Sequence, residues 1–314
     1  MGIRGLNTLI KKYSPDSITY NDVTKYKNSI VAIDASILLY KFKYASKAEN
    51  SHLIGIINRI KFYLMNSILP VFIFDGVPPD EKKITLEKRQ AQKEKIYIKL
   101  EELKRRIPET DEERENIENE INRINNQIIN VKKHHVEECK ILLEKSGIPY
   151  VIAPNDAEKY CSFIQQNGLV DYTITDDTDA ITFYCKKILK TSINSITEIN
   201  TDKILEDFEM NRDMFIDYCI LSGCDYTDTI SQIGPIKSFN LIKKHKCIEE
   251  VLKTLDKQVC NFNFLQARKI FKEFDYDVPE KFSLVYKDKD ELISFLNSHD
   301  VKKNVINKFI KILK

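Results

Sequence analysis

Residues 30–34 read IVAID and residues 71–75 read VFIFD, and each is a short apolar run that ends in an aspartate. Residues 150–152 (YVI) and 172–175 (YTIT) are similarly rich in β-branched and aromatic side chains. Short apolar runs of this kind are typical of strands buried on both faces. Helical patterns cover residues 37–44, 53–65, 136–145 and 157–166. The alternation predicts an α/β fold with a mostly parallel central sheet flanked by helices.

Carboxylates follow each of the four predicted strands. They are Asp34 after the first strand, Asp75 after the second, Asp156 and Glu158 after the third, and Asp176, Asp177 and Asp179 after the fourth. The carboxyl ends of parallel strands meet at one edge of a sheet, where ligands bind. The sequence therefore predicts a concentration of acidic side chains in a single crevice.

Such a concentration of negative charge needs a counter-charge, because the carboxylates raise one another's pKa and destabilise the fold. Ligands that are all oxygen atoms suit Mg²⁺ or Mn²⁺ better than zinc. The carboxylates are too many for one Mg²⁺, so we expect a site for two metal ions, which is an arrangement used to hydrolyse phosphate esters.

Each carboxylate also has an ordinary structural explanation. Asp34 and Asp75 could cap the helices that follow them. Asn155 and Glu158 match a capping box, and residues 175–179 (TDDTD) could form a surface turn. Four such events at equivalent strand ends favour the metal site over independent capping.

Residues 80–134 form a block of charged and amide side chains without glycine and with one proline, Pro108. The pattern predicts two long polar helices that meet near this proline. A solvated helical hairpin or coiled-coil insertion would look the same. The first helix is basic and the second begins acidic, which favours an arm that faces phosphates. The chain beyond residue 200 reads as helical, and Gly234-Pro235 precedes one of these helices.

The overall composition excludes some classes of protein. The net charge is only +2, so a basic surface must be local. Seven cysteines without a CxxC pair indicate free thiols rather than zinc ligands or disulfides. His134 and His135 are adjacent on a predicted helix, so we do not expect them to share a metal ion. With no signal-peptide pattern and no apolar run long enough to span a bilayer, we expect a soluble intracellular protein and no membrane partner.

Six segments together resemble the flap endonuclease family: MGIRGL (1–6), VAIDAS (31–36), PVFIFDGVPP (70–79), IPYVIAPNDAEKYC (148–161), TITDDTDAITF (173–183) and DYCILSGCDYTDTISQIGP (217–235). The resemblance extends from the first residue to about residue 252. It implies a PIN-like nuclease core that cuts 5′-flap or branched DNA in replication or repair. It also implies one nuclease domain over residues 1–314, with an N-terminal region (1–79), a helical arch (80–134), an internal region (135–255) containing a helix–two-turn–helix at about 219–250, and a helical C-terminal region (256–314).

The resemblance assigns a metal-binding role to seven carboxylates. They are Asp34, Asp75, Asp156, Glu158, Asp177, Asp179 and Asp225. They would hold two Mg²⁺ ions, for which Mn²⁺ could substitute. Asp225 enters only through the resemblance. Asp156 stands where the family usually has glutamate, and its shorter side chain implies indirect or weaker ligation.

The resemblance also assigns roles at the DNA. Lys82 and Arg89 correspond to basic residues at the foot of the arch that stabilise the phosphate in the transition state; without the resemblance they would be two of many solvated basic residues. Tyr40 corresponds to a tyrosine that stacks on a base near the scissile bond. Residues expected to contact the DNA backbone are Gly2, Gly234, Lys237, Lys244 and Lys246. A K⁺ ion is expected at the helix–two-turn–helix, although Gln232 and Ile236 replace a usual glycine and lysine there.

The departures from the family concern its partners and its substrate. The sequence contains no sliding-clamp peptide near residue 314, and the segment 46–51 between the first two predicted helices is short. We expect a monomer of viral or otherwise divergent origin, whose partner is branched DNA with a 5′ flap in the nucleus or at a viral replication site. A 5′-exonuclease, a junction-resolving nuclease, a ribonuclease and a catalytically silent DNA-binding scaffold remain alternatives.

Overall fold

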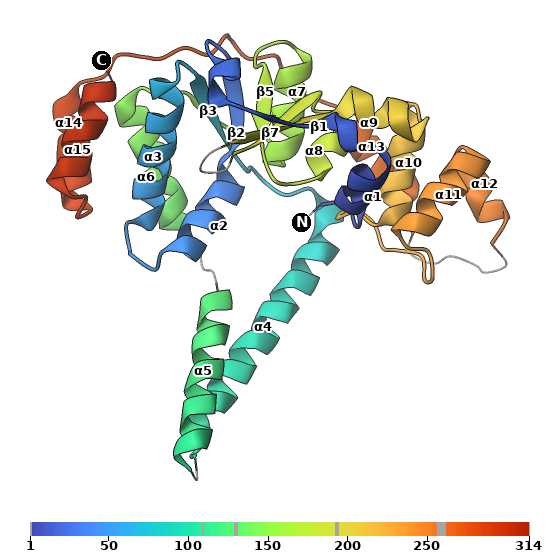
Figure 1. Cartoon of the computed structure of the whole chain (residues 1–314), viewed down its shortest axis with the longest axis horizontal. Coiled ribbons are helices and arrows are strands. Elements are labelled where there is room, and N and C mark those ends of the chain that lie inside the picture. Colours follow the sequence, from blue (N-terminus) through green and yellow to red (C-terminus); the bar gives the residue numbers. More distant parts are fainter. Residues whose placement is uncertain (1, 109, 129–130, 192–194, 256–261, 314) are drawn as a thin grey trace.

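A seven-stranded sheet forms the centre of the molecule in the computed structural model, which describes residues 2–108, 110–128, 131–191, 195–255 and 262–313 (Figure 1). The strands are β1 (Ile18–Asn21), β2 (Ile30–Asp34), β3 (Leu69–Phe74), β4 (Tyr150–Ile152), β5 (Tyr172–Ile174), β6 (Lys187–Thr191) and β7 (Ile196–Asn200). Their order across the sheet is β1-β7-β6-β5-β2-β3-β4. Strands β4, β3, β2, β5 and β6 are parallel, whereas β7 and β1 are antiparallel to their neighbours.

The four predicted strands are confirmed as β2, β3, β4 and β5, and they lie side by side in the sheet. The sequence prediction missed β1, β6 and β7. These three strands lie at one side of the sheet and mix apolar residues with lysine, threonine and asparagine. They therefore lack the continuous apolar run that identified the buried parallel strands.

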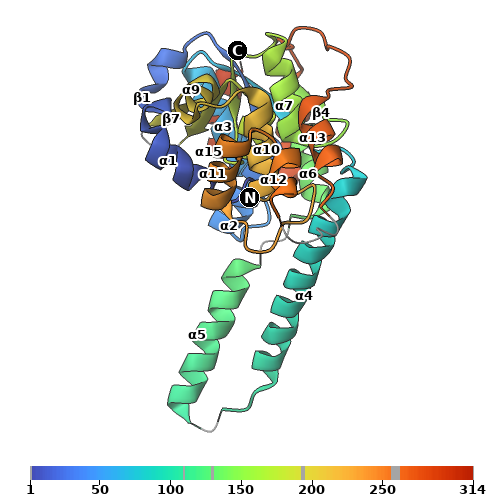
Figure 2. The ribbon, with the colours of Figure 1, turned by 90° about the vertical axis from the view of Figure 1, so that its right-hand side faces the viewer.

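Helices cover both faces of the sheet (Figures 1 and 2). The α-helices of the described residues are α1 (Leu6–Tyr13), α2 (Ala35–Ala45), α3 (Ser51–Met65), α4 (Lys83–Arg105), α5 (Asp111–Gln127), α6 (Lys133–Ser146), α7 (Ala157–Gln166), α8 (Asp179–Thr182), α9 (Thr201–Phe208), α10 (Arg212–Ser222), α11 (Pro235–His245), α12 (Ile248–Lys253), α13 (Phe264–Lys272), α14 (Lys289–Ser298) and α15 (Lys303–Ile312). All of them except α4 and α5 belong to the core. None of those within the described residues is both long and apolar enough to cross a membrane.

The alternation of side chains along the strands divides the core between the two faces. Val31 and Ile33 pack with residues of α2, α3, α6, α14 and α15. Ala32, between them, packs with Val71 and Ile73 against α7. A third apolar cluster joins α1, α8, α9, α10, α11 and α13 beyond the edge of the parallel strands. The parallel strands are therefore covered on both faces, as their continuous apolar composition predicts.

Helices α4 and α5 form a hairpin that projects from the core (Figure 2). Leu100 and Leu103 of α4 are buried against Ile124 of α5. The chain leaves α4 at Arg106, and the Thr110 hydroxyl accepts a hydrogen bond from the Glu113 N–H at the start of α5. The prediction of two long helices that meet near Pro108 is confirmed.

The C-terminal region is only partly helical. Residues 256–261 lie outside the described part of the chain, and α13, α14 and α15 are helices. Residues 273–288, however, form neither helix nor strand, so the prediction of a helical region is wrong for this segment. Phe274 and Tyr276 pack against the apolar side of α7, and the Val285 N–H donates to the Gly147 carbonyl at 3.0 Å. These contacts hold the segment against the core without helical structure.

The cysteines agree with the prediction of free thiols where the structure describes them. Cys139, Cys161, Cys185, Cys219, Cys224 and Cys247 form no disulfide. The seventh, Cys260, lies outside the described residues.

The buried seam between α4 and α5 predicts a local effect of mutation. Leu103 is 6% exposed, and Leu103→Asn places an amide in this seam at a cost of about 1–3 kcal/mol. We expect trypsin to cut the hairpin faster while the main thermal unfolding transition moves by less than about 2 °C, because the seam is separate from the core.

Ile98→Asn is the matched control, because Ile98 lies on the same helix but is 59% exposed. Equal proteolysis of both variants would contradict the seam.

Candidate active site

The sheet brings the predicted carboxylates to one edge. Asp34 is the last residue of β2, Asp75 follows β3, and Asp177 lies just after β5. Asp156 and Glu158 follow β4 at the start of α7, and Asp179 opens α8. Because β2, β3, β4 and β5 are parallel neighbours, these side chains meet at the same edge. Asp225 joins them from the turn after α10 and lines the same cavity as Asp156, Glu158 and Asp177.

Asp34 caps the helix that follows it, as the structural explanation predicts, whereas Asp75 does not. The Asp34 Oδ1 atom accepts from the Ile37 N–H at 3.2 Å and caps α2, while Oδ2 accepts from the Thr175 hydroxyl. Asp75 Oδ1 accepts from the Ala157 N–H at 2.9 Å. Asp75 thus contacts the start of α7 rather than the helix that follows it in the chain. These bonds orient both carboxylates at the edge of the sheet.

The other two structural explanations are wrong. Asn155 and Glu158 form no capping box, because α7 begins one residue later, with Asp156 at the N-cap position and no side-chain cap. The TDDTD segment is not a surface turn, since Asp177 and Asp179 are buried. Only Asp176 of its three aspartates is substantially exposed, and it pairs with Lys41.

Burial and mutual repulsion raise the pKa values of these acids. Burial, followed by the charge of Asp75, raises the pKa of Asp34 to about 7. The pKa of Glu158 is raised by burial and then by Asp34 and Asp75. Burial and the charges of Asp177 and Asp225 likewise raise the pKa of Asp179. As separate charged groups in this position, the acids would destabilise the fold.

The donor set fits divalent cations. It consists of carboxylate oxygens alone, as Mg²⁺ and Mn²⁺ prefer. Asp179 is 3% exposed, and its Oδ1 atom has no hydrogen-bond partner among the described residues. A cation bound there would satisfy this oxygen and offset the repulsion in the group.

Two basic side chains face the acids across a cavity of about 770 Å³. The Lys82 Nζ atom lies 2.7 Å from Asp156 Oδ1, and the Arg89 Nη2 atom lies 2.6 Å from Asp225 Oδ2. Burial alone would lower the pKa of Lys82, but the charges of Asp156 and Glu158 outweigh burial and raise it. Lys82 therefore keeps its positive charge, and the foot of α4 supplies positive charge to the acidic cavity.

Tyr226 belongs to this site, and the sequence reasoning missed it. Its buried hydroxyl donates to Asp156 Oδ2 at 2.8 Å, and Lys82 Nζ lies 5.6 Å from the centre of its ring. Asp156 is thus held from both sides, by Tyr226 and by Lys82. The only signal in the sequence is the position of Tyr226 next to Asp225.

Two of the predicted DNA contacts lie at the cavity. Tyr40 lines it and is partly exposed. Gly2 lies against the acids with a φ of +93°, and a Cβ atom there would lie 2.1 Å from Asp177 Oδ1 and 2.4 Å from Thr178 Oγ1. The N-terminal segment therefore packs directly on the candidate metal site.

The remaining predicted contacts lie on a separate surface. Gly234 is the N-cap residue of α11, Lys237 and Lys244 are exposed on that helix, and Lys246 follows its end. Helix α11 packs on α10 and α12, away from the parallel strands (Figure 1). The structure therefore keeps this group apart from the carboxylates.

Comparison with known proteins places the chain in a family. The family model of the XPG N-terminal domain matches residues 1–96, and that of the XPG I-region matches residues 147–225. Flap endonuclease 1 of Aedes aegypti is 39% identical over 319 residues, which cover 94% of this chain and 82% of the relative. The chain belongs to the flap endonuclease family. The resemblance seen in the sequence is confirmed, and the chain is a metal-dependent nuclease.

Solved structures agree with the predicted PIN-like nuclease fold. Flap endonuclease-1 from Methanococcus jannaschii has a TM-score of 0.68 and 26% identity, with 95% of this chain and 96% of that chain covered. The catalytic core of Rad2 in complex with DNA substrate has a TM-score of 0.77 and 24% identity, with both chains fully covered. At 24% identity, the similarity to Rad2 supports only the shared fold.

The contact of Gly2 with Asp177 predicts that this flap endonuclease relative tolerates no side chain at position 2. Gly2→Ala forces a Cβ atom into the acids and adds left-handed strain of about 1–2 kcal/mol. We expect nuclease activity at limiting Mg²⁺ to fall at least about tenfold, with partial recovery at high Mg²⁺.

Gly168→Ala is the control, because Gly168 has a φ of +71° but no atom lies within 4 Å of the place that an added Cβ would take. Normal activity of Gly2→Ala would contradict the proposed packing.

Proposed function

We propose that this protein is a structure-specific 5′-nuclease that hydrolyses phosphodiester bonds in 5′-flap or branched DNA with the help of two divalent cations. The observation that carries the proposal is the group of carboxylates at the sheet edge, four of which are buried (Asp34, Asp156, Asp177 and Asp179), beside Lys82 and Arg89 in one cavity. Membership of the flap endonuclease family gives the substrate class.

The candidate metal ligands are the seven predicted carboxylates, and Mg²⁺ is the expected ion with Mn²⁺ as a substitute. Bound ions would lower the pKa of a water molecule and neutralise charge on the scissile phosphate. The hydrogen bonds to Asp34 and Asp75 hold these two carboxylates in place without any ion. Asp156 is held by Tyr226 and Lys82, which offsets the freedom that its shorter side chain would otherwise give it.

Lys82 and Arg89 would bind the phosphate at which the reaction takes place. Each is now paired with an acid, Lys82 with Asp156 and Arg89 with Asp225. A substrate phosphate in the cavity would offer both side chains another anionic partner. Placed beside that phosphate, they would stabilise the charge that develops in the transition state.

The DNA would be held at two places. Tyr40 would stack on a base next to the cavity, and the N-terminal segment at Gly2 would border the same strand. The turn before α11, with Gly234, Lys237, Lys244 and Lys246, would contact duplex phosphates without reading sequence. A K⁺ ion at this turn is part of the proposal. The 5′ single strand would pass beside α4, whose foot lines the cavity.

The protein would act as a monomer on branched DNA, in the nucleus or at a viral replication site, and without direct clamp binding through the family's peptide. A 5′-exonuclease or junction-resolving nuclease would use the same carboxylates. These alternatives differ in the substrate that is cut best, so a substrate panel separates them.

The test is cleavage of labelled 5′ flap, nicked duplex, gapped duplex, four-way junction and RNA flap at one salt concentration, since binding to phosphates varies steeply with salt. We expect the 5′ DNA flap to be cut fastest in Mg²⁺ and Mn²⁺. Asp179→Ala should abolish cleavage and leave DNA binding intact. Lys82→Ala and Arg89→Ala should each lower kcat about 100-fold or more.

Lys83→Ala is the control, because Lys83 is next to Lys82 but exposed and paired with Asp80, outside the cavity. Binding without cleavage in either metal would indicate a silent scaffold, and faster cleavage of RNA would indicate a ribonuclease. Either result contradicts the proposal.

A further inference from the structure

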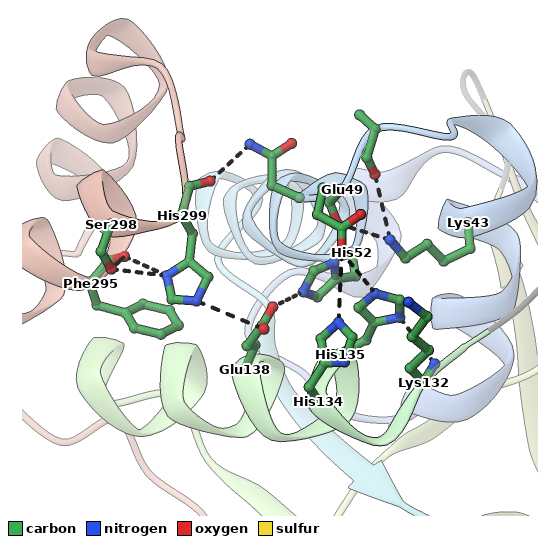
Figure 3. Close-up of polar contacts among 12 residues, drawn as sticks. Lys43, Glu49, His52, Lys132, His134, His135, Glu138, Phe295, Ser298 and His299 are labelled. Carbon is green, nitrogen blue, oxygen red and sulfur yellow. Dashed lines mark hydrogen bonds and ion pairs between the residues drawn. The ribbon is translucent and has the colours of Figure 1, made fainter.

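Four of the five histidines in the chain gather around Glu49 and Glu138 (Figure 3), and none of them lines the cavity of the candidate metal site. His52 of α3 and His299 after α14 both face Glu138 of α6, at 2.6 Å and 3.9 Å. His134 and His135 face Glu49 instead, at 3.7 Å and 3.9 Å. His52 Nε2 is within hydrogen-bond distance of Glu138, whereas His135 lines an open pocket.

His134 and His135 lie closer together than their adjacent positions on a helix suggest, although the sequence did not predict a shared metal ion. Their ring centroids are 4.2 Å apart, and the ligand atoms of Glu49, His134 and His135 lie within 4.8 Å of one another. Both residues lie in the first turn of α6, where the exposed His134 ring turns toward Glu49. The spacing alone would suit a metal ion.

The protonation of His135 disfavours a metal ion. Its Nδ1 atom accepts a hydrogen bond from the Lys132 N–H at 3.1 Å, so the proton of the neutral ring is on Nε2. Burial, followed by the charge of Lys43, lowers the pKa of His135 to about 4, which keeps the ring neutral. Metal ligation requires a lone pair on the nitrogen that faces the ion. Here that nitrogen carries the proton and is a donor.

The surroundings of the pocket are positive. It has a volume of about 330 Å³, and its wall includes Lys43, Ser46, Lys47, Glu49, Lys132 and His135. The start of α6 adds the positive end of a helix dipole. Lys43 Nζ donates to the Glu49 backbone carbonyl at 2.9 Å rather than to a carboxylate. Three lysines thus face one acid, Glu49, among the described residues of the wall.

The buried Nε2 donor of His135 is a second observation that favours an anion in the pocket. The residue is 3% exposed, and its Nε2 atom has no hydrogen-bond partner in the described part of the chain. A buried donor without an acceptor destabilises the fold. The Glu49 carboxylate lies 3.9 Å from this atom, which is too distant for a hydrogen bond, and its side chain is 85% exposed. An oxyanion in the pocket would satisfy the donor.

We propose that the pocket formed by Lys43, Lys47, Lys132 and His135 binds a phosphate group, and that the group comes from the DNA strand that passes the base of the arch. The source of the phosphate rests on the proposed function. The pocket lies between the α2–α3 connection and the ends of α5 and α6 that anchor the arch. The Glu49 carboxylate beside the pocket would repel a bound phosphate.

The first experiment uses inorganic phosphate and follows the ring signals of His135 by NMR, without metal ions or DNA. Phosphate should shift these signals saturably. Glu49→Gln should tighten binding about three- to tenfold, because it removes the competing charge. Lys43→Gln and Lys132→Gln should each weaken it about fivefold.

Lys145→Gln is the control, because Lys145 lies at the other end of α6 and pairs with Glu291. A gain of affinity in Glu49→Gln cannot result from misfolding. Unchanged affinity in Glu49→Gln, or saturable Zn²⁺ binding that shifts the His135 signals in place of phosphate, would overturn the phosphate site.

The second experiment identifies the source of the phosphate by measuring DNA binding in EDTA. Lys43→Gln and Lys132→Gln should weaken binding to a flap with natural linkages, but not to one whose flap carries uncharged methylphosphonates. Equal loss with both flaps would overturn the DNA assignment. The measurement needs no cleavage, so a protein that fails to cut flaps would contradict the proposed function while the phosphate titration still tests the pocket.

Discussion

The repulsion between buried carboxylates at the edge of the parallel strands is the constraint on which the rest of the structure depends. Burial and the charges of neighbouring acids raise the pKa of Asp34, Glu158 and Asp179. A fold that minimised its free energy would keep such groups apart. The strand ends and helix caps of the fold hold them together, so the folded protein contains unfavourable electrostatic repulsion between these acids. This repulsion indicates that bound cations supply the compensating charge.

The basic residues at the start of α4 complete this arrangement only in part. Lys82, the N-cap residue, and Arg89 pair with Asp156 and Asp225. Among the described residues, no basic side chain forms an ion pair with Asp34, Asp177 or Asp179. The start of the hairpin therefore brings two positive charges to a strongly acidic cavity. These two side chains could contact a phosphate, but they do not neutralise all of the acids, so cations are still required. The positive pocket at the ends of α5 and α6 differs from this cavity, because its lysines lie beside a buried N–H donor instead of a cluster of acids. We therefore assign it to phosphate binding and not to cation binding.

The sequence predicted the parts of the fold that carry a continuous signal. Strands β2 to β5 were found because burial on both faces makes them apolar throughout, and the carboxylates were found because they follow directly. Strands β1, β6 and β7 escaped because their composition is mixed. Asp225 came only from the family resemblance, and Tyr226 was missed, since tertiary packing alone brings them to the site. The pairing of Glu49 with His134 and His135 was missed for the same reason.

The free energy of unfolding as a function of pH, with EDTA or with Mg²⁺, tests the central claim most directly. Acids whose pKa is raised by folding, such as Asp34 at about 7, stabilise the fold while protonated and lose that contribution as pH rises. In EDTA the free energy of unfolding should fall by on the order of 2 kcal/mol between pH 5 and pH 8, and saturating Mg²⁺ should restore it most at pH 8. Equal stability in EDTA and Mg²⁺ at pH 8, with no decline from pH 5, would contradict the account.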